Sequence, residues 1–388
     1  MDWRSMTHRL TRSATLVFAA AVLLCVARAQ DQPSPSESLP LLKIDLHKFK
    51  YDTSGSTRRL QKFIDFTDAD HLAVAWVTLD DPTLAVKPGI IAKPAHLHVL
   101  ILDTKTGRNA GMQAWPTPSN RVRFFGARDG EFLTCTGNVL RIFSPDFEVI
   151  RERDLHSACQ NAVASNIRFG ASPSKRTLLL SSFAKEGYEY MLLNVETFAV
   201  IASWHEKSRI VDISDHWLLG SCAERREACI KRIDADWRPF SYPESGQAND
   251  FAVPRFINDD TLIGGWPGKS VVTVEGVPMF QMQPPKNRLF ESDVTVSGGD
   301  RFAVIEDRNR GFSNPALDME FFSSERAIVY SVAERRAIYA AGVKGDSLWT
   351  PWASHRNQLA LSPDGALLAI LDGADLKVYR LPDDNSAH

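Results

Sequence analysis

The sequence predicts an all-β fold, a seven-bladed β-propeller whose blades are four-stranded antiparallel sheets. Three observations lead to this prediction. A turn-rich motif between two apolar stretches occurs seven times along the chain. A second strand pair follows each of the first six copies, and the seventh copy stops after its third strand. A spare strand-like segment precedes the first copy and can complete the last sheet.

The repeated unit is clearest near the end of the chain, where Leu359–Pro382 reads LALSPDGALLAILDGADLKVYRLP. Its Ser362–Gly365 turn consists of residues that tolerate or pre-set turn dihedral angles. The flanking apolar stretches are typical of buried strands. The mean period of about 49 residues favours propeller blades over helical repeats. The earlier copies lie in Ile64–Trp76, Arg123–Cys135, Ile167–Ser182, Val211–Cys222, Pro254–Trp266 and Asp293–Asp307.

The spare strand lies in Leu39–Phe49, where apolar residues alternate at Leu42, Ile44 and Leu46. An unpaired sheet edge invites unwanted pairing, and a ring must join its first and last blades. We therefore expect this N-terminal strand to pair with the last blade and close the circle. The alternatives are a pair of β-sandwich sheets or two smaller domains.

The first 29 residues have the pattern of a bacterial Sec-type signal peptide. A basic N-terminal region precedes the uncharged stretch Ala14–Val26, which at about thirteen residues is too short to span a bilayer. Small residues before Gln30 then provide a signal-peptidase cleavage site. An uncleaved membrane anchor is the alternative. The sequence thus divides into a signal peptide (1–29), a disordered lead-in (30–38), the propeller (39–382) and a C-terminal tail (383–388), and predicts a secreted or periplasmic protein.

Composition narrows the range of partners. The formal net charge is −2 and no polybasic run is present, so nucleic acid is not an expected partner. No segment after the signal peptide has eighteen consecutive apolar residues, so we expect no membrane span in the mature chain, which we predict to be a monomer.

Four cysteines remain after the signal peptide, an even number that suggests disulfides in an exported chain. Cys222 and Cys229 bracket a short polar run between two strand-like stretches, and a bridge across that hairpin is easy to form. Cys135 and Cys159 would then pair by default. Two other pairings, or free buried thiols, are the alternatives.

The Ser-Pro-Asp-Gly turn and the Asp-Thr-x-Thr-Gly turn at Leu102–Gly107 resemble those of secreted bacterial β-propellers of the YVTN/TolB-like and WD40-like families. The resemblance covers nearly the whole mature chain at the level of pattern. It implies a propeller fold and an exported location, and it transfers no catalytic residues. The chain lacks the Gly-His and Trp-Asp signatures of WD40 repeats and has no room for the N-terminal domain of TolB-like proteins.

Two long loops suggest a ligand-binding face. They interrupt the first unit (Thr78–Ala95) and the sixth unit (Glu306–Glu325), which both neighbour unit seven in a seven-membered ring. The linker into unit seven adds aromatic and basic residues. Exposed aromatic residues and arginine are typical of recognition hot spots. The candidate ligand-binding residues are Trp349, Trp352, His355, Arg356, Asp80, Asp81, Arg308, Arg310 and Phe312. The alternative is that the two tryptophans pack between blades.

Sequence motifs for catalysis or cofactor binding are absent, and we predict no cofactor. His96 and His98 lie two apart on a strand and are weak candidates for metal ligands, because no third ligand has a suitable spacing. The sequence therefore favours an exported, non-enzymatic scaffold that binds a protein, peptide or glycan. The alternatives are a hydrolase or lyase, lactonase- or glycan-active, with a site in the central channel, and a redox propeller with a quinone cofactor.

Overall fold

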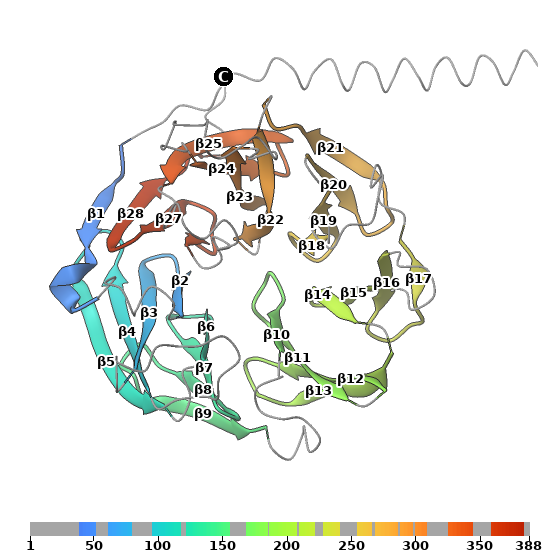
Figure 1. The fold of residues 1–388 in the computed structure, drawn as a ribbon, viewed down its shortest axis with the longest axis horizontal. Helices are drawn as coiled ribbons and strands as arrows, with labels where there is room; N and C mark the ends of the chain where they lie inside the picture. Colours follow the sequence, from blue (N-terminus) through green and yellow to red (C-terminus); the bar gives the residue numbers. More distant parts are fainter. Residues whose placement is uncertain are drawn as a thin grey trace, which may run out of the picture.

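In the part of the chain that the structure describes, seven four-stranded antiparallel sheets stand around a central axis (Figure 1). The computed structural model describes residues 39–51, 61–79, 95–117, 122–155, 168–184, 186–207, 209–221, 228–240, 254–265, 268–285, 288–297, 299–308, 325–343 and 358–383. The predicted signal peptide and lead-in lie outside these ranges. Among the described residues, no helix has the length and apolar character needed to cross a membrane. The predicted seven-bladed propeller is confirmed.

Each blade runs from an innermost strand at the axis to an outermost strand at the rim. Blade 1 contains β2 (Lys62–Phe66), β3 (His71–Leu79), β4 (Ala95–Asp103) and β5 (Asn109–Thr117). Blade 2 contains β6 (Val122–Gly126), β7 (Phe132–Thr136), β8 (Val139–Phe143) and β9 (Val149–Asp154). Blade 3 contains β10 (Arg168–Ala171), β11 (Thr177–Ala184), β12 (Gly187–Asn194) and β13 (Val200–Glu206).

The later blades repeat this order. Blade 4 contains β14 (Ile210–Ile213), β15 (Trp217–Ser221), β16 (Ala228–Arg232) and β17 (Arg238–Pro239). Blade 5 contains β18 (Arg255–Phe256), β19 (Thr261–Gly264), β20 (Lys269–Thr273) and β21 (Pro278–Met282). Blade 6 contains β22 (Arg288–Val296), β23 (Arg301–Arg308), β24 (Glu325–Ser331) and β25 (Arg336–Val343). Blade 7 contains β26 (Leu359–Leu361), β27 (Leu367–Asp372) and β28 (Asp375–Arg380).

The fourth strand of blade 7 comes from the start of the described chain. Strand β1 (Leu42–Asp45) pairs antiparallel with β28, with Leu42 opposite Val378 and Ile44 opposite Leu376. This confirms the predicted closure. The strand is shorter than the alternation suggested, because a 3-10 turn (Leu46–Phe49) begins where the Asp45 carboxylate accepts the backbone N–H of His47 at 3.0 Å.

Apolar side chains fill the seven spaces between adjacent blades. Both faces of a middle strand therefore lie against protein, and strands such as β3 and β27 are continuous apolar runs rather than alternating ones. Leu46 is completely buried in the space between blades 7 and 1, where the closing segment joins the core. The hydrophobic core thus lies between the sheets, and each blade buries its apolar side chains against both neighbouring blades.

The Ser-Pro-Asp-Gly turn that identified the repeat has the expected geometry. The backbone N–H of Gly365 donates to the Ser362 carbonyl at 2.8 Å, and Gly365 has φ +71°, which favours glycine. The Ser362 hydroxyl accepts the backbone N–H of Leu367 at 2.9 Å and donates to Asp364. This serine therefore begins the turn and aligns the following strand.

The predicted pairing of Cys135 with Cys159 is wrong, because Cys135 is a free thiol. Its side chain is 3% exposed and packs with apolar residues between blades 2 and 3, as a small hydrophobic residue does. Cys229 is disulfide-bonded. Its predicted partner Cys222 lies outside the described residues, so the Cys222–Cys229 pairing stays a prediction.

Cys135 is expected to be inert to thiol reagents in the folded protein. Burial raises the pKa of its thiol to about 12, and only the thiolate is a good nucleophile. Labelling with a chromogenic aromatic disulfide, followed by peptide mapping, should therefore modify Cys135 only after denaturant is added. Complete labelling within minutes in buffer at pH 8 would contradict the buried position.

Candidate functional site

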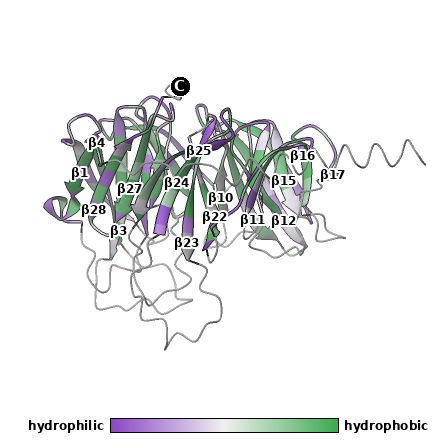
Figure 2. Ribbon diagram, turned by 90° about the horizontal axis from the view of Figure 1, so that it is seen from above, coloured by the Kyte–Doolittle hydropathy of each residue, from purple (hydrophilic) through white to green (hydrophobic). Residues whose placement is uncertain are grey.

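The ring has two different faces. On the turn face, short turns join the first strand of each blade to the second. On the insertion face, the second strand is followed by the third, and the chain passes from one blade to the next. Figure 2 shows the ring edge-on, with β3 and β23 reaching toward the same side. The ends of β3 and β23, after which the predicted long loops begin, therefore lie at the insertion face, on the blades that flank blade 7.

One of the predicted ligand-binding residues lies within the described part of the chain. Arg308 is the last residue of β23, at the insertion face. The remainder lie outside the described residues, namely Asp80, Asp81, Arg310, Phe312, Trp349, Trp352, His355 and Arg356. The structure thus places the strands from which the predicted surface would extend, and the surface itself stays a prediction.

The two candidate metal ligands lie on β4 in a packed setting. His98 stacks on Trp76, with ring centroids 5.1 Å apart, and its Nε2 is 2.9 Å from the Thr78 hydroxyl. His96 is the nearest other imidazole, with a centroid distance of 6.4 Å. Among the described residues, no group of three histidine, cysteine or acidic side chains could hold a metal ion. The geometry of His98 is that of a cross-strand packing residue.

His98 should make the protein less stable in mild acid. Burial, and secondarily the charge of His96, lower the pKa of His98 below its ordinary value of 6.5. The unfolded chain therefore binds this proton more readily, so stability is lost as the pH falls through the interval between 6.5 and the lower folded pKa. Urea unfolding at several pH values should show this loss, and H98Q should reduce it. An unchanged pH dependence in H98Q would refute this role.

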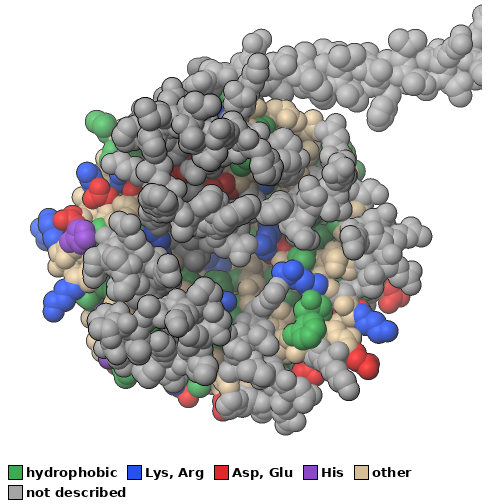
Figure 3. Space-filling view, viewed as in Figure 1, with side chains coloured by type: hydrophobic (Ala, Val, Ile, Leu, Met, Phe, Trp, Pro, Cys, Tyr) green, Lys and Arg blue, Asp and Glu red, His purple; other side chains and the backbone are tan. Residues whose placement is uncertain are grey.

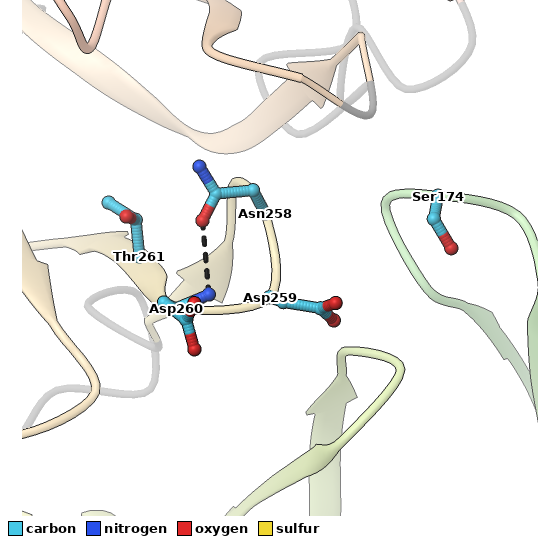
Figure 4. Close-up of a pocket in the computed structure, with 5 residues that line it drawn as sticks. All are labelled: Ser174, Asn258, Asp259, Asp260 and Thr261. Atoms are coloured by element: carbon cyan, nitrogen blue, oxygen red, sulfur yellow. Dashed lines mark hydrogen bonds between the residues drawn. The ribbon is translucent and has the colours of Figure 1, made fainter.

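A polar cavity of about 420 Å³ opens at the turn face (Figure 4). Ser174 lines it from the turn after β10, and the other lining residues come from blade 5. Figure 4 shows Asp259 pointing toward the side of Ser174, and the Asn258 side chain accepting the backbone N–H of Asp260 at 3.1 Å. The blade 5 residues are Asn258, Asp259, Asp260 and Thr261.

Hydrogen bonds between blades fix the acidic groups around this cavity. The Asp215 carboxylate of blade 4 accepts from the Ser174 hydroxyl at 2.6 Å and from the Thr177 hydroxyl at 3.1 Å, both in blade 3. The Asp259 carboxylate of blade 5 accepts the backbone N–H of Asp215 at 2.8 Å, and its other oxygen is 3.2 Å from Nδ1 of His216. Asp259 therefore bridges blades 4 and 5.

A second connection joins three blades at the channel wall. Lys175 of blade 3 forms an ion pair with Asp65 of β2, with Nζ and Oδ1 2.7 Å apart, and donates to the Phe66 carbonyl at 3.1 Å. The other Asp65 oxygen accepts the backbone N–H of Gly126 in blade 2 at 2.8 Å. In the same way, the Asp212 carboxylate of β14 accepts the backbone N–H of Phe256 in blade 5 at 2.7 Å. These carboxylates hold innermost strands together.

Sequence reasoning missed these inter-blade carboxylates. A usable signal was present, since Asp65 and Asp212 each lie between apolar residues of an innermost strand, in KFIDF and IVDI. An acidic residue in such a strand needs partners, and the nearest donors belong to the next blade. Asp65, Asp212, Asp215 and Asp259 thus all have structural partners in a neighbouring blade.

A scan against family models finds no match, and no curated protein matches in sequence. Among solved structures, the chain is similar to Hsv2 of Kluyveromyces marxianus (10% identity, 84% of this chain and 94% of that chain, TM-score 0.48). It is also similar to the Pan2 WD40 domain of Neurospora crassa (8% identity, 91% of this chain and 98% of that chain, TM-score 0.39). A third similar structure is TolB of Acinetobacter baumannii (12% identity, 76% of this chain and 78% of that chain, TM-score 0.37).

These neighbours include a WD40 domain and a TolB protein. With identities of 8 to 12%, this likeness concerns the fold alone.

Proposed function

We propose that the chain is an exported, non-enzymatic scaffold that binds a protein, peptide or glycan through its insertion face. One observation supports this choice of face. The second strands of blades 1 and 6 end, and their third strands begin, on the insertion face, and these two blades flank blade 7. Long segments between such strands are where rigid scaffolds usually present ligand-binding residues.

Blade 7 provides a rigid base for such a surface. Its innermost and middle strands β26 and β27 are buried throughout, and it packs on blade 6 on one side and blade 1 on the other. Residues that extend from its two neighbours would converge above a base that is packed on both sides. In this proposal, Trp349 and Trp352 supply the aromatic contacts, and Arg308, Arg310 and Arg356 the polar ones.

The experiment compares residues 30–388 with single variants W349A and W352A on a glycan array and against a displayed peptide library. A ligand found with the parent chain is expected to lose at least tenfold in affinity in both variants, because aromatic hot spots commonly contribute 2 kcal/mol or more. R176A, on the exposed turn face, is the control and should bind normally. Thermal melting should change by only a few degrees in all variants.

Two results would overturn the proposal. A fall in melting temperature of many degrees in W349A and W352A would assign these tryptophans to packing between blades. Stoichiometric calcium or zinc in the purified protein, with turnover of a lactone or glycan, would instead favour the hydrolase or lyase reading.

A further inference from the structure

The turn-face cavity of about 420 Å³ lies between the turns of two blades that are not neighbours in the ring. Ser174 of blade 3 lines one side and the turn of blade 5 lines the other, with blade 4 between them. The Asp259 carboxylate extends toward the Ser174 turn (Figure 4). The volume is within the usual range for sites that enclose a small ligand.

One residue of the lining carries a hydroxyl with no partner in the protein. Thr261 is the first residue of β19 and is 6% exposed, and its hydroxyl forms no hydrogen bond among the described residues. The corresponding residue of blade 3, Thr177, begins β11, and its hydroxyl donates to the Asp215 carboxylate at 3.1 Å. An unmet hydroxyl in a buried position costs free energy, and a ligand in the cavity can supply the missing partner.

Four carboxylates lie in the lining or beside it, and none forms an ion pair with a lysine or arginine among the described residues. Asp215 and Asp259 are held by hydroxyl and backbone N–H donors, which fix a carboxylate without cancelling its charge. Asp300 accepts one N–H of the Asn258 amide at 3.2 Å. The Asp260 carboxylate is exposed and has no partner in the described part of the chain.

Positive charge is scarce at the cavity. Around the rim in Figure 3, lysine and arginine side chains lie close to acidic ones, whereas no basic residue is among the described residues that line the cavity. Arg176 of the Ser174 turn is exposed, and His216 beside Asp259 is charged only when it is protonated. The other basic residues nearby have partners elsewhere, namely Lys175 with Asp65, Arg255 with Asp212, and Arg301 with two carbonyls of blade 7.

We infer that this cavity binds a guanidinium group, carried by an arginine side chain of a protein partner or by a small free guanidine. A guanidinium group has five N–H donors in one plane and can pair with a carboxylate through two parallel hydrogen bonds. Asp259 and Asp260 can accept such bonds, and the Thr261 hydroxyl can accept one more. A bare metal ion fits less well, because no group of three histidine, cysteine or acidic side chains in the described residues could hold one.

The test is calorimetric titration of residues 30–388 with N-acetyl-arginine amide and with agmatine, a free guanidine. One equivalent is expected to bind, with an affinity that falls on going from 50 to 200 mM salt. N-acetyl-lysine amide should bind at least threefold more weakly, because an ammonium group cannot form the two parallel bonds. Binding of the arginine amide would assign the site to a side chain of a protein partner, and binding of agmatine alone would assign it to a free guanidine.

Two variants remove acceptors that have no role in the fold. D260N should weaken binding at least fivefold and T261V at least threefold, because a hydrogen bond to a charged group is stronger than one to a hydroxyl. The control D129N removes an exposed carboxylate from the turn of blade 2, on the same face, and should change the affinity less than twofold. T261V should leave the midpoint of urea unfolding unchanged, whereas T177V should lower it, because the Thr177 hydroxyl donates to Asp215.

Absence of saturable binding of both guanidines, or equal weakening by D260N and D129N, would overturn the inference. Equal affinity for the lysine amide would overturn the choice of a guanidinium group. W349A and W352A should bind both guanidines normally, so failure of the insertion-face proposal and failure of this site can be told apart.

Discussion

Removal of the closing segment is expected to cost about 5 kcal/mol or more of the free energy of unfolding, since burying one large apolar side chain contributes about 1.5–3 kcal/mol. Leu46 is fully buried between blades 7 and 1, and Leu42, Ile44 and Phe49 pack against the same cluster. Truncation would also expose the edge of β28, which β1 covers in the ring. An unpaired edge of this kind favours association between molecules.

The comparison is urea unfolding of residues 30–388 and 51–388, with light scattering to detect association. L46A in the longer chain should lose about 2–5 kcal/mol by itself, the range for leucine removed from a core. K43A is the control, because Lys43 lies on the same strand with its side chain 61% exposed, 3.8 Å from Asp375. Equal stability of the two chain lengths within 1 kcal/mol would show that the ring does not need this strand.

The repeat and the closing strand could be predicted because both are local. The Ser362 turn with its apolar flanks is one short segment of the sequence, and the alternation around Ile44 is another. The residue at which the closing strand ends could not be predicted, because an apolar Leu46 fits both a continued strand and a turn packed on the core. The strand ends there because the Asp45 carboxylate accepts the backbone N–H of His47 and begins the 3-10 turn.

The candidate site could be predicted less well, because its contacts join distant segments. Lys175 and Asp65 are 110 positions apart, so an acidic residue within a strand indicates that a partner is needed without indicating which one. Cys135 was assigned to a disulfide by counting, whereas its environment decides otherwise.

Gly126→Ala is expected to destabilise the ring by about 3 kcal/mol or more, at the upper end of the effect of overpacking a core. A Cβ at Gly126 would lie 2.1 Å from the Phe66 carbonyl oxygen and 3.2 Å from Nζ of Lys175. The close neighbour is backbone, so β6 would have to move away from β2. That movement would also lengthen the hydrogen bond from the Gly126 N–H to Asp65.

Gly170→Ala is the matched control, because Gly170 lies on β10, the innermost strand of the next blade, and a Cβ there would meet nothing within 4 Å. It should change stability by less than about 1 kcal/mol, and a gain is possible because alanine restricts the unfolded chain. The double variant D65A/G126A extends the argument. If both residues act through one connection between blades 1, 2 and 3, its loss of stability in urea should be smaller than the sum of the single losses. Additive losses would mean that the close packing of β2 and β6 and the ion pair with Lys175 act independently.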